Sequence, residues 1–271
     1  AEMLNEVQQL AQKYGFSLYA ENQSMASALG AELLPVARFG NVVDVVLAMG
    51  GDGTVLYTSR AFHGSDVPIL GINLGSLGFL TSVGDSEIAE ALEAIASESY
   101  KVSERMVSEC RIYNGATLLG VESSLNDVVL GWGSSSRIVG LELRIDGEAV
   151  GRFMCDGMMV STPTGSTGHA LAAGGPILHP GIAGFGINVI CPHTLGSRPL
   201  VVPDSSRIVI DVVSAAKELI LSIDGQDEYA VERGARIEIE KSPHAARFLQ
   251  LREHSYFSVL SQKLHWRGSA L

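Results

Sequence analysis

The sequence predicts an N-terminal open α/β domain and a C-terminal antiparallel β-sandwich domain. In the first hundred residues, segments with helical spacing of apolar residues alternate with short apolar runs typical of buried parallel strands. Further along the chain, strand-like runs are separated by turn dipeptides that favour hairpins. The length of 271 residues also suits two domains better than one, because single domains average roughly 100–200 residues.

The α/β domain is expected over residues 1–100. Val42–Ala48 is a continuous apolar run, as in a strand covered on both faces, and Ser86 is a good N-cap for the helix that follows it. In chain order, the expected elements are helix 4–14, strand 16–20, helix 25–34, strand 42–48, a turn at 50–54 that leads into a helix to about 62, strand 68–73 and helix 86–96. This alternation predicts an open, Rossmann-like arrangement.

The β domain is expected over residues 101–254. Three dipeptides favour turns with positive φ between paired strands, namely Asn114-Gly115, Asp146-Gly147 and Asp224-Gly225. The strand-like runs are 128–130, 138–145, 208–213, 219–223 and 236–240. A helical stretch follows near the C-terminus, and we expect residues 255–271 to pack back on the first domain.

The charge balance and composition argue against nucleic-acid and membrane partners. The chain carries 19 basic and 30 acidic residues and a net charge of −11, whereas nucleic-acid binders are basic. No apolar window approaches the ~18 residues of a membrane helix, and the first residues lack the basic region of a signal peptide. The three cysteines, Cys110, Cys155 and Cys191, are widely spaced and are expected to be inert core residues. We therefore expect a cytoplasmic protein.

The first candidate site is the glycine-rich turn Gly50–Thr54, directly after a predicted strand. Its glycines let backbone amides approach phosphate oxygens, and the start of the following helix adds a positive dipole. Asp52 lies inside this turn, where a carboxylate would repel phosphates, so its expected task is to hold a metal or to accept a proton from an attacking hydroxyl. A plain capped turn is the alternative. No Lys follows as in a Walker A loop, and Leu56 takes the last glycine place of G-x-G-x-x-G.

Two shorter motifs also adjoin predicted strands. Asn73–Leu80 follows a strand, and the carboxyl ends of neighbouring strands in an open sheet form the usual ligand crevice. The two glycines before Phe79 suggest a backbone that passes close beneath a ring. Asn126 and Asp127 precede a strand, and the carboxylate of Asp127 can accept two hydrogen bonds from vicinal ribose hydroxyls. A hydrophobic loop and a turn cap, respectively, explain these motifs as well.

The longest polar tract, Asp156–His169, lies between a strand and a predicted short helix. It offers hydroxyls and backbone amides to a polar ligand rich in oxygen. So long a polar, glycine-rich tract rarely lies beside apolar strands without a partner. The histidines of the chain, in contrast, show no metal-ligand spacing.

Together these motifs resemble the bacterial type of the NAD kinase family. The family's motifs occur here in order: GGDGT/N at 50–54, N-x-G-x-L-G-F-L at 73–80, Asn-Glu/Asp at 126–127, D-G-x-x-x-S-T-P-T-G-S-T at 156–167, A-G-G-P-I at 173–177 and Asp-Gly-Gln at 224–226. The resemblance implies transfer of the γ-phosphoryl group of ATP to the 2′-hydroxyl of the adenosine ribose of NAD, with a divalent cation, expected to be Mg²⁺. It also implies the two-domain fold shared with diacylglycerol kinases, and a homodimer or homotetramer.

The resemblance further assigns roles to residues. Asp52 is the implied proton acceptor; because an aspartate is a weak base for an alcohol, we expect it to orient the hydroxyl and take the proton late. The positions implied at the nucleotide sites are Gly50, Gly51, Gly53, Thr54, Phe79, Asn126, Asp127, Arg137, Met154, Asp156, Thr164, Thr167, Gly168, His169, Ala170, Leu171, Ala172 and Gln226. In the family, the equivalent of Asp156 contacts NAD bound mainly by a neighbouring subunit. Oligomerisation is therefore expected to complete the site.

Two positions depart from the family pattern. His169 replaces a tyrosine that lines the NAD site, and we expect it to keep a ring contact and to make binding depend on pH, since imidazole titrates near neutral pH. Met154 stands where many members have an arginine, which removes one polar contact. Two other functions stay open, a diacylglycerol-type lipid kinase that shares the GGDG loop and a catalytically silent NAD-binding sensor. Inorganic polyphosphate is the alternative to ATP as donor.

Overall fold

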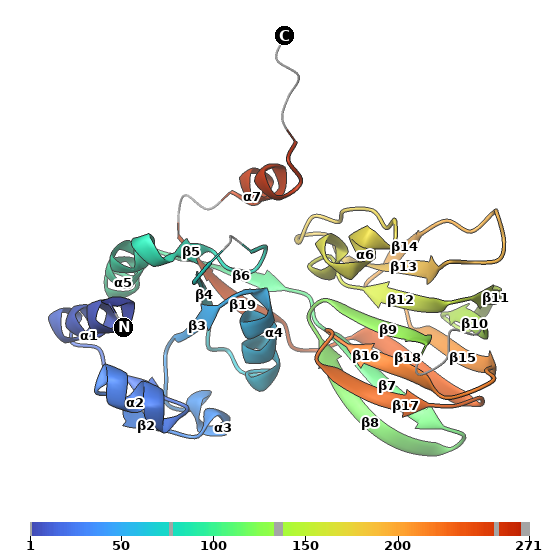
Figure 1. Cartoon of the computed structure of the whole chain (residues 1–271), viewed down its shortest axis with the longest axis horizontal. Helices are drawn as coiled ribbons and strands as arrows, with labels where there is room; N and C mark the ends of the chain where they lie inside the picture. The colour runs from blue at the N-terminus through green and yellow to red at the C-terminus, as the bar shows by residue number, and fades with distance from the viewer. Residues whose placement is uncertain (1, 76–77, 133–137, 252–254, 267–271) are drawn as a thin grey trace, which may run out of the picture. The chain divides into compact units, whose positions relative to one another are not determined.

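The computed structural model describes residues 2–75, 78–132, 138–251 and 255–266. The chain divides into two compact units (Figure 1), one formed by Ala1–Glu104 and Ala246–Leu271 and the other by Arg105–Ala245. Residues 101–104 and 246–251, which the sequence analysis places in the β domain, therefore fall in the first unit. The packing of residues 255–271 stays a prediction.

The first unit is an open α/β structure, as expected from the sequence. Its main sheet has the strand order β3-β4-β19-β6, with β5 beside β4, and β3, β5 and β19 each run parallel to β4. The short strands β1 and β2 form a separate parallel pair. The elements are α1 (Glu2–Tyr14), β1 (Tyr19–Ala20), α2 (Gln23–Leu29), β2 (Glu32–Leu33), α3 (Val36–Phe39), β3 (Val46–Gly50), α4 (Asp52–Ala61), β4 (Ile69–Asn73), β5 (Val83–Gly84), η1 (Asp85–Glu87), α5 (Ile88–Ala96), β6 (Lys101–Arg105), β19 (Ala246–Gln250) and α7 (Tyr256–Lys263).

The core of the first unit forms because its helices bury their apolar faces against the central strands. Val7 of α1 and the α5 residues Ile88 and Leu92 are buried in one cluster with Leu70 and Ile72 of β4. All five residues of β4 are buried, as in a strand covered on both faces. This packing holds the carboxyl ends of β3 and β4 in place, where the glycine turn and the loop after β4 begin.

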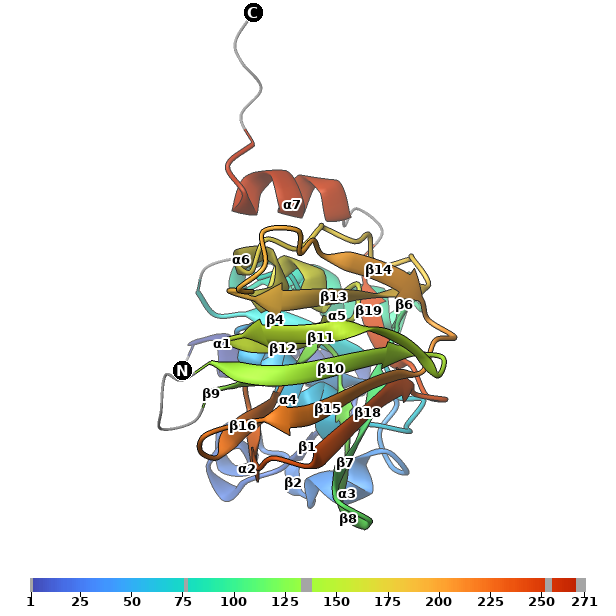
Figure 2. The same ribbon diagram turned by 90° about the vertical axis from the view of Figure 1, so that its right-hand side faces the viewer.

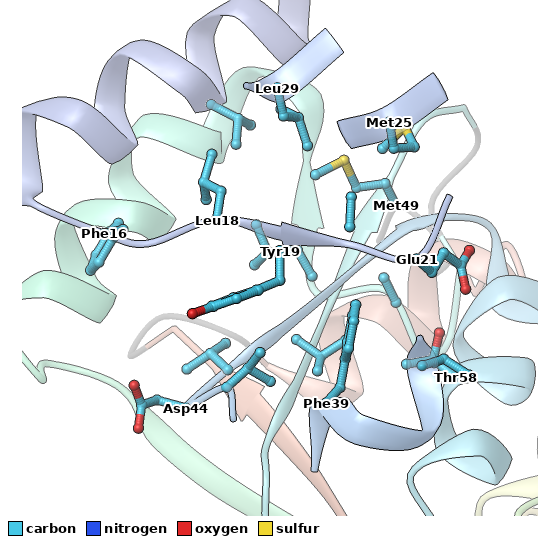
Figure 3. Close-up of a pocket in the computed structure, with 18 of the residues that line it drawn as sticks. Phe16, Leu18, Tyr19, Glu21, Met25, Leu29, Phe39, Asp44, Met49 and Thr58 are labelled. Atoms are coloured by element: carbon cyan, nitrogen blue, oxygen red, sulfur yellow. The ribbon is translucent and has the colours of Figure 1, made fainter. Parts of the chain in front are cut away.

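A cavity of about 590 Å³ lies beside β3, which forms one end of the sheet order. Figure 3 shows Tyr19, Phe39 and Met49 among the side chains that surround it. Among the described residues that the sequence analysis assigns to the nucleotide sites, Thr54 alone lines this cavity. The cavity therefore adjoins the glycine turn only at Thr54 and at Met49, which directly precedes Gly50.

The second unit is an antiparallel β-sandwich of two six-stranded sheets, which confirms the predicted fold class. One sheet has the order β11-β10-β15-β18-β7-β8, of which β11, β10, β15 and β18 lie side by side in Figure 2; the other has the order β14-β13-β12-β9-β16-β17. The elements are β7 (Ser108–Asn114), β8 (Thr117–Ser124), β9 (Asp127–Trp132), β10 (Val139–Ile145), β11 (Glu148–Cys155), β12 (Gly157–Ser161), η2 (Gly165–Thr167), α6 (His169–Ala172), β13 (Gly184–Ile190), β14 (Leu200–Pro203), β15 (Ile208–Ser214), β16 (Leu219–Ile223), β17 (Asp227–Val231) and β18 (Ala235–Lys241).

The two sheets enclose a single core because alternate residues of their strands point inward. Leu141 and Ile210 from one sheet are buried in the same cluster as Leu130, Met158 and Phe185 from the other. This core leaves the strand ends, with their turns and loops, as the places where polar groups gather.

The three predicted hairpins are confirmed as β7–β8, β10–β11 and β16–β17. In two of them both turn residues have positive φ, 52° at Asp146 with 86° at Gly147, and 52° at Asp224 with 66° at Gly225. Such turns match the right-handed twist of the paired strands, and Asp-Gly tolerates them well. The two Asp-Gly turns thus share their local geometry.

Two of the three cysteines match the expectation of inert core residues. Burial raises the pKa of Cys110 to about 12 and that of Cys155 to about 11, so both thiols stay protonated. The expectation is wrong for Cys191, which is exposed where the chain leaves β13. Among the described helices, none has the length and apolar character needed to cross a membrane.

Candidate active site

Asp52 lies where the carboxyl ends of two parallel strands meet. β3 and β4 pair in register with Gly50 opposite Asn73, so the turn after β3 and the loop after β4 leave the sheet at the same edge. The helix α4 begins at Asp52, and Gly51 is its extended N-cap residue. Open α/β sheets bind their ligands at this edge.

The loop after β4 holds the Asp52 carboxylate. Its Oδ2 accepts a hydrogen bond from the backbone N–H of Phe79 at 2.9 Å, and its Oδ1 accepts one from the N–H of Leu80 at 3.0 Å. A carboxylate oxygen can accept more than one hydrogen bond, and this side chain is only half-buried. The two amides therefore set its direction and leave it able to receive a further hydrogen bond or a proton.

Glycine provides the space for this carboxylate. A Cβ at Gly78 would lie 1.9 Å from Asp52 Oδ1, and one at Gly50 would lie 2.2 Å from Thr54 Oγ1. The sequence suggests that the glycines before Phe79 let the backbone pass beneath a ring. The structure shows instead that Gly78 approaches the carboxylate of Asp52.

The other residues of the glycine turn, and Phe79 of the loop after β4, differ in their exposure to solvent. Gly51, Gly53 and Thr54 are exposed, while Gly50 and Phe79 are half-buried. A Cβ at Gly51 or Gly53 would meet no atom within 4 Å. A ligand can therefore approach the backbone of these two glycines closely.

Three segments of the second unit leave one sheet at the same edge. β9 lies between β12 and β16, with Asp127 opposite Ser161 and Val128 opposite Ile223 (Figure 1). The bend before β9, the polar tract after β12 and the turn after β16 therefore come together. They carry the predicted residues Asn126, Asp127, Thr164, Thr167 and Gln226.

The polar tract is bound to the bend before β9 through backbone groups. The N–H of Thr162 donates to the carbonyl oxygen of Asn126 at 2.8 Å, and the hydroxyl of Thr162 donates to the carbonyl oxygen of Leu125 at 2.5 Å. A Cβ at Gly165 would lie 2.1 Å from the Asn126 carbonyl oxygen. Close contact between these two segments therefore requires glycine at position 165.

Hydroxyls of the tract also close its own loop. Ser166 is buried, and its hydroxyl donates to the carbonyl oxygen of Pro163 at 2.6 Å and accepts from the N–H of Leu178 at 2.9 Å. The hydroxyl of Thr167 donates to the carbonyl oxygen of Thr164 at 3.2 Å. The sequence predicts that hydroxyls of this tract face a ligand; the hydroxyl of Ser166 instead holds the loop together.

Asp127 is the most perturbed acid of the site. Its side chain is 5% exposed. Burial, assisted by the negative charge of Asp224, raises the pKa of Asp127 to about 7. Near neutral pH this carboxyl group is therefore divided between its protonated and ionised forms, and a ligand that donates hydrogen bonds to it favours the ionised form.

The remaining predicted residues are distributed around the end of β11 and the short helix α6. Asp156 is half-buried between β11 and β12, and Met154 is exposed. At α6, Gly168, His169 and Ala172 are exposed, Leu171 is half-buried and Ala170 is buried, and Gln226, in the turn after β16, is exposed. Arg137 lies outside the described residues.

Two residues that the sequence analysis does not assign have clear parts in these arrangements. Gly78 leaves room for the Asp52 carboxylate, and the signal for it is its place directly before Phe79. Asp224 contacts the bend before β9, although the sequence analysis treats it only as a turn residue and as the first residue of the Asp-Gly-Gln motif. Neither contact can be deduced from local pattern, because each joins segments far apart in the chain.

The described residues contain no cluster of three or more His, Cys, Asp or Glu side chains able to hold a metal ion. Mg²⁺, however, is usually bound by one or two carboxylates together with substrate phosphates. Asp52 supplies one carboxylate with unused acceptor capacity at an edge suited to phosphates. The residues present therefore fit a cation that arrives with a nucleotide.

The fold and this site define a two-unit phosphotransferase, in which an open α/β unit carries an aspartate in a glycine turn and a β-sandwich carries a second polar site. Models of the ATP-NAD kinase N-terminal domain and of the ATP-NAD kinase C-terminal domain match residues 3–100 and 125–251, respectively. The chain belongs to the ATP-NAD kinase family.

Relatives and solved structures agree with this assignment. The chain is 43% identical to the NAD kinase of Geotalea daltonii over 223 residues, covering 82% of this chain and 78% of the relative. It is 37% identical to the NAD kinase of Koribacter versatilis over 267 residues, covering 98% and 93%.

Two crystal structures share the fold. The yeast NADH kinase complexed with NADH superposes with a TM-score of 0.89 at 25% identity, covering 99% of this chain and 85% of that one. An NAD kinase from Archaeoglobus fulgidus in complex with ATP gives 0.74 at 27% identity, covering 93% and 99%. The chain is thus a phosphotransferase of the NAD kinase type, and the comparisons support neither a diacylglycerol-type lipid kinase nor a silent sensor.

Proposed function

We propose that this chain transfers the γ-phosphoryl group of ATP to the 2′-hydroxyl of the adenosine ribose of NAD, giving ADP and NADP. The observation that carries the proposal is the Asp52 carboxylate, held by the amides of Phe79 and Leu80 in a glycine turn at the edge of a parallel sheet. The yeast and archaeal relatives, whose structures hold NADH and ATP, support both substrate classes.

Asp52 orients the attacking hydroxyl and receives its proton. Phosphoryl transfer proceeds through a loose transition state, in which catalysis consists mainly of positioning and charge stabilisation. A carboxylate is a weak base for an alcohol, so Asp52 takes the proton late, once the new phosphorus–oxygen bond has formed enough to acidify it. The fixed direction of this carboxylate is what such a role requires.

The nucleotides contact two sets of residues. Gly50, Gly51, Gly53 and Thr54 offer backbone groups at the start of α4, where phosphates are favoured by the helix dipole. The Asp127 carboxylate accepts hydrogen bonds from ribose hydroxyls of NAD, and the Asn126 amide can accept from them or donate to them. The further proposed NAD contacts are Phe79, Arg137, Met154, Asp156, Thr164, Thr167, Gly168, His169, Ala170, Leu171, Ala172 and Gln226.

A divalent cation, Mg²⁺ in our proposal, accompanies the phosphates of ATP. It supplies positive charge to the transferring phosphoryl group, whose oxygens share the developing charge. On this chain Asp52 is the carboxylate that fits it, beside the backbone amides of the glycine turn. Inorganic polyphosphate presents the same terminal phosphoryl group and is the alternative donor.

We also propose that the enzyme works in the cytoplasm as a homodimer or homotetramer. The resemblance implies that Asp156 contacts NAD bound mainly by a neighbouring subunit, and Asp156 is half-buried between β11 and β12. Sedimentation velocity measures the subunit number. Mixed oligomers of Asp52→Asn and Asp156→Ala subunits should regain activity that neither variant has alone, because one site then contains both native aspartates.

The reaction itself is tested by incubating the purified chain with NAD, ATP and Mg²⁺ and coupling the product to a dehydrogenase specific for NADP. We expect NADP to form in proportion to enzyme and to depend on ATP. Separate reactions with polyphosphate replacing ATP identify the donor. A folded protein that forms no NADP with either donor contradicts the proposal.

A further inference from the structure

The bend between β8 and β9 is fixed from two sides. On one side, Thr162 binds the carbonyl oxygens of Leu125 and Asn126. On the other side, the backbone N–H groups of Leu125, Asn126 and Asp127 all point to a single acceptor. That acceptor is the side chain of Asp224, 97 residues further along the chain from Asp127.

The Asp224 carboxylate accepts four hydrogen bonds from the bend. Its Oδ2 accepts from the N–H of Leu125 at 2.9 Å, and its Oδ1 accepts from the N–H of Asn126 at 2.7 Å and of Asp127 at 3.1 Å. The hydroxyl of Ser124 donates to the same Oδ1 at 2.7 Å. Successive backbone amides directed at one anion form a strong binding concavity, and here the anion is a side chain of the protein.

The turn geometry explains how Asp224 reaches the bend. Asp224 and Gly225 both have positive φ, and the N–H of Gln226 donates to the carbonyl oxygen of Ile223 at 2.9 Å, which closes a tight hairpin. The N–H of Asp224 also donates to the carbonyl oxygen of Asp127 at 2.9 Å. Backbone and side chain of one residue therefore hold the same bend, and Asp224 is left only 8% exposed.

We propose that Asp224 is a positioning residue for the dinucleotide: its carboxylate fixes the 124–127 bend so that Asn126 and Asp127 present their side chains to NAD in one conformation. This inference rests on the proposed function, since it assigns NAD to these two side chains. All four hydrogen bonds of the Asp224 carboxylate come from residues 124–127, so we assign Asp224 a role that acts through Asn126 and Asp127. Preorganised contacts of this kind lower the cost of ordering the site on binding.

The test compares two Asp-Gly turns of the same geometry. Asp224→Asn puts an amide donor where backbone amides need an acceptor, so at least one hydrogen bond of the bend is lost. Asp146→Asn is the matched control, because Asp146 occupies the equivalent position of the β10–β11 hairpin and accepts instead from the N–H of Arg207 at 2.7 Å. Both variants are measured as the full chain by steady-state kinetics and by calorimetric binding of NAD.

A positioning role predicts a change that is selective for NAD. In Asp224→Asn, KM and Kd for NAD should rise about 10- to 100-fold, while kcat and KM for ATP stay within about threefold. The control should keep KM for NAD within about twofold of the wild type. Wild-type values in folded Asp224→Asn, or an equal rise in the control, would overturn the inference.

Two further measurements keep the test decisive. If Asp224→Asn fails to fold, Ser124→Ala removes one of the four donors and should raise KM for NAD about 3- to 10-fold; an unchanged KM then counts against the inference. If the wild type forms no NADP, the proposed function has failed. The calorimetric Kd values of the wild type and the Asp224 variant still decide whether Asp224 positions an NAD site.

Discussion

Asp52 and Asp224 stand in similar sequence contexts and have opposite surroundings. Each directly precedes a glycine, and each follows closely on a strand. Asp52 accepts two backbone hydrogen bonds and is half-buried, whereas Asp224 accepts four hydrogen bonds and is 8% exposed. The first carboxylate is held with acceptor capacity to spare, and the second is fully used by the fold.

In the roles that we propose, one residue type serves chemistry in one unit and structure in the other. A reactive carboxylate needs a fixed direction and at least one unused lone pair, so two amide donors suit it. A carboxylate that organises a bend needs enough donors to offset its burial, because an unpaired buried charge is costly. The number of donors and the exposure of the side chain distinguish the two roles.

The largest effect is expected for Asp52→Asn. The amide cannot accept the proton of the 2′-hydroxyl, so kcat should fall about 10³-fold, within the usual range for loss of a general base. NAD binding should change much less than kcat, although the new amide group loses one of the two hydrogen bonds from the N–H groups of Phe79 and Leu80. Coupled NADP formation and calorimetric NAD binding measure the two effects. A kcat equal to that of the wild type would show that Asp52 takes no part in the reaction. Asp52 and Asp224 would then no longer differ in role.

A smaller loss is expected when the Asp52 carboxylate is displaced rather than replaced. In Gly78→Ala the new Cβ would overlap Asp52 Oδ1, at 1.9 Å in the present geometry. We expect kcat to fall about 10- to 100-fold, since a misplaced catalytic group costs about that much. Gly75→Ala is the control in the same loop, because a Cβ there meets no atom within 4 Å. Equal kcat values for Gly78→Ala and Gly75→Ala would show that the direction of the Asp52 carboxylate does not affect the reaction.

The buried acid beside Asp224 should make folding stability depend on pH. The pKa of Asp127 is raised to about 7 by burial and by Asp224, so between about pH 4 and 7 the unfolded chain releases this proton and the folded chain keeps it. The wild type should therefore lose stability relative to Asp127→Asn as the pH rises through this window, and the difference should level off above pH 7. Over the whole window the wild type should lose a few kcal/mol of unfolding free energy relative to Asp127→Asn, because each unit of pKa difference corresponds to about 1.4 kcal/mol.

Urea unfolding of both proteins at several pH values measures this difference. Parallel stability curves from pH 4 to 8 would show that Asp127 ionises as readily in the folded chain as in the unfolded one. In the wild type, KM for NAD should fall as the pH rises toward and beyond 7, because the ionised carboxylate accepts hydrogen bonds from ribose hydroxyls.

The smallest effect is expected at the exposed His169. Replacing it with the tyrosine of the family pattern keeps a ring at the position, so KM for NAD should change only about two- to fivefold. Any pH dependence of KM contributed by the imidazole should disappear in His169→Tyr and persist in Asp127→Asn. A KM profile from pH 5.5 to 8 separates the two groups. Identical profiles for the wild type and His169→Tyr would exclude a contribution from His169.

Much of the fold follows from local pattern. The buried runs that became β3 and β4 and the Asp-Gly dipeptides of β10–β11 and β16–β17 identify their elements, because apolar periodicity and positive φ are local requirements. β19 is different. It joins the sheet of the first unit beside β4, although it follows the whole β-sandwich in the chain. No local signal indicates which sheet a short apolar strand will join.

The candidate site, like the fold, has some features that the sequence predicts and others that only the folded chain shows. The sequence by itself determined that Asp52 stands in a glycine turn after a buried strand and that Asn126 and Asp127 precede another, since these are properties of neighbouring residues. Only the tertiary structure decided that Gly78 adjoins Asp52, that Asp224 holds the bend and that Asp127 is a weak acid. Hydrogen bonds between segments 27 and 97 residues apart and the loss of solvent around a carboxyl group exist only once the chain has folded.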